Sequence, residues 1–144
     1  MEVKVEQKEV AIKRLRLLLA VLFFWDIGIG VYAIFFAKHF QQFILFTPQN
    51  EPLFIRGVGV YWLFAAYIQF LGFKNPGKNI VAVQLSIVFR LSAAVIDFIE
   101  VFFLLGKPIY FFHYLLVFFV FMNCLIAYLT VSCLRRMNLK WIEI

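Results

Sequence analysis

Four long stretches of this chain are apolar almost throughout, and short polar segments separate them. The stretches cover residues 15–37, 53–73, 80–105 and 109–134. Because a helix needs about 20 apolar residues to cross the hydrocarbon of a bilayer, each stretch is long enough to be a transmembrane helix. Their apolar residues are continuous rather than alternating, which excludes the strands of a membrane β-barrel.

The segments between the stretches are short and contain residues that end helices. These residues are Pro48, Pro52, Asn75, Pro76, Gly77, Gly106 and Pro108. No segment is long enough to fold as a soluble domain. We therefore expect one all-α domain over residues 1–144, an integral membrane four-helix bundle. The first stretch is longer than the core of a signal peptide and no small-residue cleavage site follows it, so we expect it to remain as a span.

The composition supports a membrane protein. Hydrophobic residues make up 65% of the 144 residues, and the mean hydropathy is +0.92. In a soluble domain only about half of the residues are apolar. The lipid bilayer is therefore the first partner that the sequence predicts.

The net charge of +6 would suggest a nucleic-acid partner in a soluble protein, but here the distribution of the basic residues has a simpler explanation. On one side of the four predicted spans lie Lys4, Lys8, Lys13, Arg14, Arg16, Lys74, Lys78, Arg135, Arg136 and Lys140. Only Lys38 and Lys107 lie on the other side. By the positive-inside rule both termini are cytoplasmic, the basic residues face lipid headgroups, and no nucleic acid is expected.

Three polar residues on three different spans are predicted to share the middle of the bilayer. At a rise of about 1.5 Å per residue, Asp26, Arg90 and Asn123 each lie ~15–16 Å from the cytoplasmic end of their span. A lone ion at that depth costs several kcal/mol, so we expect the three side chains to form a network in which Arg90 pairs with Asp26.

Small residues accompany these polar residues on one face of each helix, which allows neighbouring helices to approach closely. The predicted interior faces carry Asp26, Gly30, Ala33 and Ala37 in the first span, Ala82, Ser86, Arg90, Ala94 and Asp97 in the third, and Asn123, Ala127 and Thr130 in the fourth.

A second group of charges lies nearer the outer surface. Arg56 is close to the start of the second span, and Asp97 and Glu100 occupy the outer third of the third span. We expect Arg56 to pair with Asp97 or Glu100. Both predicted pairs either fix helix register alone or serve a function such as proton relay or anion binding.

Two histidines are candidates for binding a cofactor. His39 ends the first predicted span and His113 begins the fourth, so both are expected at the outer interface. Two imidazoles at matching depth there can ligate haem, the magnesium of a pigment or a transition metal. The alternative is that they belong to the interfacial belt, as His113 lies beside Tyr110 and Tyr114. The sequence predicts no other metal site.

Aromatic side chains offer a further candidate site, a lipophilic pocket for a quinone, sterol or lipid. Its lining would come from Trp25, Tyr32, Tyr61, Trp62, Tyr67 and Tyr128. Because aromatic residues make up 20% of the chain, any pocket would be aromatic by chance. No Ser/His/Asp constellation, zinc-protease motif or phosphate-binding loop is present, so nothing in the sequence names an enzyme.

One arrangement resembles a known family. Arg56-Gly57 near the start of the second span, followed by Arg90 and, seven residues on, Asp97, is similar to the small bacterial four-helix membrane proteins of the DoxX type. The resemblance implies an inner-membrane protein of a kind that sometimes acts beside respiratory or redox partners, without shared catalytic residues. The aromatic fourth span departs from the Leu/Ala-rich pattern of that family.

Two functions follow as hypotheses. With almost no mass outside the membrane, the chain is expected to be an accessory or structural subunit of a larger membrane complex, in contact with other subunits or with copies of itself. The alternative is a binder or carrier of a lipophilic small molecule, in which Asp26, Arg90 and Asn123 recognise the polar end of the ligand. An isomerase or oxidoreductase using Asp97 or Glu100 as acid or base has no motif to support it.

Overall fold

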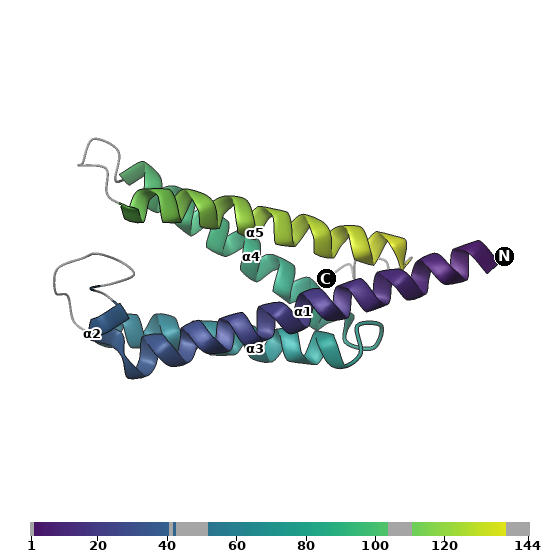
Figure 1. Ribbon diagram of the computed structural model, residues 1–144, viewed down its shortest axis with the longest axis horizontal. Coiled ribbons are helices and arrows are strands. Elements are labelled where there is room, and N and C mark those ends of the chain that lie inside the picture. The colour runs from purple at the N-terminus through teal and green to yellow at the C-terminus, as the bar shows by residue number, and fades with distance from the viewer. Residues whose placement is uncertain (1, 41, 43–51, 104–110, 138–144) are drawn as a thin grey trace.

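The computed structural model describes residues 2–40, 42, 52–103 and 111–137, and these residues are helical almost throughout (Figure 1). The helices are α1 (Glu2–Phe35), α2 (Ala37–Phe40), α3 (Pro52–Lys74), α4 (Ile80–Phe103) and α5 (Phe111–Arg136). No strand occurs in these ranges. The predicted all-α class is therefore confirmed.

Three of the helices contain segments that are long and apolar enough to cross a membrane, which is consistent with a membrane protein. These segments are Glu6–Phe35, Ile80–Phe102 and Tyr114–Arg136. The remaining predicted span, residues 53–73, coincides with α3 but is not among them. Arg56 and Gln69 lower the hydropathy of α3 within an otherwise apolar helix.

The first helix is longer than the apolar stretch from which it was predicted. It begins at Glu2, and its 34 residues give a length of about 51 Å. The polar residues before residue 15 are mostly strong helix formers, and α1 already packs into the core at Ala11, which is 2% exposed. Burial of Ala11 extends the packed face of α1 to the N-terminal side of residue 15, which explains why the helix begins before the apolar stretch does.

The four long helices form two antiparallel pairs, α1 with α3 and α4 with α5 (Figure 1). The pairs approach each other at the end that holds the α3–α4 turn and the end of α5. They diverge toward the end that holds α2 and the start of α5 (Figure 1). Each helix therefore packs mainly against its own partner, and the two pairs meet over part of their length.

The packing of apolar side chains follows this arrangement. One buried cluster joins the two pairs at the end where they approach: Ala11, Leu15, Leu19, Val83, Ile87, Ala127, Leu134 and Met137. A second buried cluster lies at the diverging end and belongs to the α1–α3 pair and α2 alone: Ala33, Ala37, Phe40 and Ile55. The apolar contacts that hold the two pairs together are thus concentrated at one end of the molecule.

Two glycines let α1 and α3 approach each other closely. A Cβ added to Gly30 would lie 2.9 Å from the carbonyl oxygen of Gly59, and one added to Gly59 would lie 2.8 Å from the carbonyl oxygen of Gly30. By contrast, Gly28 and Gly57 have open space where a Cβ would stand. Close packing of α1 against α3 therefore requires Gly30 and Gly59, whereas Gly28 and Gly57 are not required for it.

The short turn between α3 and α4 is held by asparagine side chains. The Nδ2 of Asn79 donates to the carbonyl oxygen of Leu71, 2.6 Å away, in the last turns of α3. The Oδ1 of Asn75 accepts from the backbone N–H of Lys78 at 3.2 Å. These bonds satisfy backbone groups that a helix end leaves without partners, and they fix α4 antiparallel to α3.

Candidate functional site

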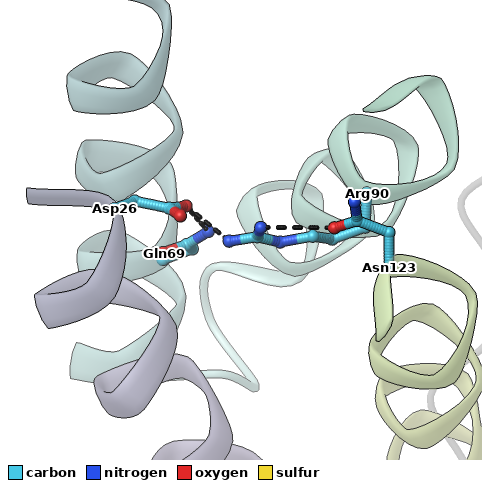
Figure 2. A network of polar contacts seen from close by, with 4 residues as sticks. All are labelled: Asp26, Gln69, Arg90 and Asn123. Atoms are coloured by element: carbon cyan, nitrogen blue, oxygen red, sulfur yellow. Dashed lines mark hydrogen bonds and ion pairs between the residues drawn. The ribbon is translucent and has the colours of Figure 1, made fainter. Parts of the chain in front are cut away.

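An ion pair joins the two helix pairs near the middle of the molecule. A guanidinium nitrogen of Arg90, on α4, donates to the carboxylate of Asp26, on α1 (Figure 2). Asp26 is 1% exposed and Arg90 is 9% exposed. This is the pair that the equal depth of the two residues predicts.

Gln69 on α3 is a member of the same network that the sequence analysis missed. Its Nε2 donates to Oδ2 of Asp26 at 2.7 Å, and the residue is 1% exposed. The signal was present in the sequence, since Ala65, Gln69 and Gly72 follow the same spacing of small and polar residues as the other interior faces. Gln69 lies close to the end of its predicted span, so depth alone did not group it with Asp26.

Asn123 on α5 extends the network toward the diverging end. Its Oδ1 accepts from Nη1 of Arg90 at 3.4 Å (Figure 2), and its Nδ2 donates to Oδ2 of Asp97 at 3.3 Å. Arg90 and Asp97 are two helical turns apart on α4, and Asn123 fills the interval from the neighbouring helix. A continuous chain of polar contacts therefore runs from Gln69 to Asp97 and includes all four long helices.

The interior faces predicted from small and polar residues are largely buried. The buried members are Asp26, Gly30, Ala33, Ala37, Ala82, Ser86, Arg90, Ala94, Asn123, Ala127 and Thr130. Asp97, at the outer end of its stripe, is only partly buried. The structure thus assigns these faces to the interior, and many of the exposed positions between them are phenylalanines.

The second predicted pair is wrong. Within the described residues, the only ion pair is the one between Arg90 and Asp26, and neither Asp97 nor Glu100 is paired with Arg56. Arg56 lies near the start of α3 and the two carboxylates lie near the end of α4, on helix pairs that diverge toward this end (Figure 1). The prediction used depth along the helices alone, and depth does not report the lateral separation of residues on different helices.

The buried network leaves some of its hydrogen-bonding capacity unused. Three of its atoms are buried without a hydrogen-bond partner: Oδ1 of Asp26, Oε1 of Gln69 and Nε of Arg90. The carboxylate of Asp26 and the guanidinium of Arg90 neutralise each other, so this pair carries no net charge. The network therefore stabilises the contact between the two helix pairs, near the point where the pairs begin to diverge.

The two candidate cofactor ligands lie on different helix pairs. His39 is an exposed residue of α2, and its Nδ1 is hydrogen-bonded with the hydroxyl group of Tyr32. His113 lies in the first turn of α5, where its side chain is outside the described residues. Because α2 and the start of α5 belong to the diverging ends of the two pairs (Figure 1), a haem or pigment role for these histidines stays a prediction.

The aromatic residues considered for a lipophilic pocket do not converge on one cavity. Tyr67 contributes to a shallow apolar groove of about 250 Å³ between α1 and α3, together with Phe23 and Phe70. Trp25 is 56% exposed and Tyr128 is 68% exposed, so both lie on outer surfaces. Apart from Tyr67, the described residues that line the groove have hydrocarbon side chains only, so few polar groups are available to orient a ligand.

The part of the chain that the structure describes contains no group of three or more His, Cys, Asp or Glu side chains that could hold a metal ion. No family model, curated protein or solved structure matches the chain. The similarity to DoxX-type proteins and the respiratory or redox partners that it implies stay predictions from the sequence.

Proposed function

We propose that this chain is a small membrane protein with four spans that serves as an accessory or structural subunit of a larger complex. In this proposal both termini face the cytoplasm of a bacterium, and the complex lies in its inner membrane. Three apolar helices of membrane-spanning length support the placement. The α3–α4 turn and the end of α5 also lie at the same end of the molecule (Figure 1). Basic residues therefore gather at this end, since Lys74 ends α3, Lys78 lies in the turn, and Arg135 and Arg136 end α5.

The observation that carries the proposal is the contrast between two groups of charges. Near the middle of the molecule, Asp26 and Arg90 neutralise each other and are almost completely buried. Nearer the diverging end, Glu100 and Arg56 are exposed, and neither forms an ion pair within the described residues. Asp97 is partly buried and receives a hydrogen bond from Asn123, but no cation pairs with it there.

A charge within a membrane-spanning helix costs several kcal/mol unless it is paired or reaches water. Glu100 lies one turn before the end of α4 on a surface that also carries exposed Ile96 and Ile99. A neighbouring subunit that presents a basic or hydrogen-bonding side chain at this level would lower that cost. The surface of α4 around Asp97 and Glu100 is therefore the proposed contact with the complex.

The experiment is purification of the tagged chain from its native membranes in a mild detergent, followed by mass spectrometry. We expect other membrane subunits at a fixed stoichiometry. Glu100→Gln should reduce the recovered partner at least several-fold, whereas Ser92→Ala, at another exposed polar position of α4, should not. Recovery of the wild-type chain as a monomer alone would contradict the proposal, and equal recovery with Glu100→Gln would remove Glu100 from the interface.

The alternative function, a binder or carrier of a lipophilic molecule, is supported by the unpartnered buried atoms of Asp26, Gln69 and Arg90. A ligand with a small polar end would supply the missing hydrogen bonds. The same purified sample tests it, because a quinone, sterol or other lipophilic molecule bound in equal amount to the chain appears in the mass spectrum. Partner subunits without such a molecule would favour the accessory role.

A further inference from the structure

A hollow lies between the N-terminal part of α1 and the end of α5, away from the buried network. Its volume is about 480 Å³, within the range of ligand sites in proteins. The described residues that line it are Glu6, Gln7, Val10, Arg14 and Arg136. Two helices far apart in the sequence therefore contribute one arginine each to the same hollow.

The charges around the hollow are unbalanced. Among the described residues of the lining, Arg14 and Arg136 supply two positive charges and Glu6 supplies one negative charge, a net charge of +1. Among the described residues, Glu6 forms no ion pair with either arginine. The neighbouring Arg16 is directed elsewhere, since its Nη2 donates to the carbonyl oxygen of Lys74 at 3.4 Å. Two arginines therefore line a hollow of about 480 Å³, and neither is neutralised by an ion pair among the described residues.

The position of the hollow suggests the source of that anion. Arg14 directly precedes the first apolar stretch, and Arg136 follows the fourth within two residues. Both arginines therefore lie where the apolar surface of the molecule ends, which is the level of lipid phosphates in a membrane. Guanidinium groups bind phosphate oxygens through paired, charge-assisted hydrogen bonds.

We propose that this hollow binds the phosphate of an anionic phospholipid, with Arg14 and Arg136 as the phosphate ligands and Gln7 as a hydrogen-bonding residue for the rest of the headgroup. The inference goes beyond the role of the chain in a complex, although it rests on the membrane placement within that proposed function. It differs from general attraction between basic termini and lipid, because it assigns the binding to two of the several basic residues at this end.

Lipid binding to the purified chain in a neutral detergent tests this site, because individual bound lipids are resolved by native mass spectrometry. Phosphatidylglycerol and phosphatidylcholine are titrated separately. The test variant is Arg14→Gln/Arg136→Gln. The matched control is Lys13→Gln/Arg135→Gln, which removes the same charge from exposed neighbours that do not line the hollow.

We expect tighter binding of phosphatidylglycerol than of phosphatidylcholine. The test variant should weaken phosphatidylglycerol binding at least about tenfold, since two charge-assisted contacts are lost, and the control should weaken it far less. Equal loss in both variants, or no preference for the anionic lipid, would overturn the inference. Inorganic phosphate is added in a further titration, and complete displacement of the lipid by millimolar phosphate would assign the hollow to free phosphate and overturn the lipid assignment.

Membrane insertion is measured first, by alkaline extraction of membranes that contain the chain. Release of the chain into the soluble fraction would contradict the proposed function itself. A chain that stays in the membrane but shows no selective lipid binding would overturn only the headgroup site.

Discussion

The ion pair between Asp26 and Arg90 leads to a quantitative prediction about stability. Removing one partner leaves the other charge buried, since Asp26 is 1% exposed and Arg90 is 9% exposed. Loss of one member of a buried pair costs about 3–5 kcal/mol, whereas replacement of both by uncharged groups of similar shape is often close to neutral. Asp26→Asn and Arg90→Met should therefore each lower the free energy of unfolding by about 3–5 kcal/mol.

The double variant Asp26→Asn/Arg90→Met should lose less stability than the sum of the two single variants. We expect a coupling energy of about 3 kcal/mol, at the upper end of values for residues in direct contact. The assay is equilibrium unfolding of the chain in bicelles or in mixed micelles with increasing denaturing detergent, followed by circular dichroism. Additive losses would mean that the two side chains do not interact, and the proposed joint between the helix pairs would then be wrong.

Two further predictions use matched substitutions within one helix or one residue type. Gly30→Ala should destabilise the chain by about 1–3 kcal/mol, because the new Cβ would stand 2.9 Å from the backbone of α3. Gly28→Ala, with nothing within 4 Å, should be neutral or stabilising in the same unfolding assay. Gln69→Leu should cost about 1.5–3 kcal/mol, because its hydrogen bond to a buried carboxylate is lost. Gln84→Leu should cost less, since the buried Nε2 of Gln84 has no partner, and a reversed order would contradict both assignments.

The interior of the molecule was largely predictable from local pattern. A polar residue inside a membrane-spanning helix must avoid lipid, and small residues at helical spacing beside it indicate which face meets a neighbour. Ala82, Ser86, Arg90 and Ala94 follow this rule on α4, and all four are buried. The same rule, applied to α3, predicts that Gln69 faces the interior, so the sequence contained enough information to include this residue.

The outer charges show what this local rule does not predict, which is whether residues on two different helices are close enough to pair. Arg56, Asp97 and Glu100 lie at similar predicted depth, and their charges are complementary. Their separation results from the angle between the two helix pairs, which is set by side-chain packing along whole helices (Figure 1). Toward the diverging end, the close approach at Gly30 and Gly59 holds α1 against α3. At the opposite end, the apolar cluster that includes Leu15 and Val83 joins the α1–α3 pair to the α4–α5 pair.

The sequence by itself determined the helical class, the approximate extent of the apolar helices and the pairing of Asp26 with Arg90. These features depend on hydropathy, helical periodicity and the cost of a lone charge in an apolar environment, all of which act over short stretches of chain. Only the tertiary structure decided that the helices form two diverging pairs, that Asn123 links Arg90 to Asp97, and that Arg14 and Arg136 share one hollow. Those features depend on the directions in which whole helices cross, and crossing directions arise from the sum of many side-chain contacts between segments distant in the sequence.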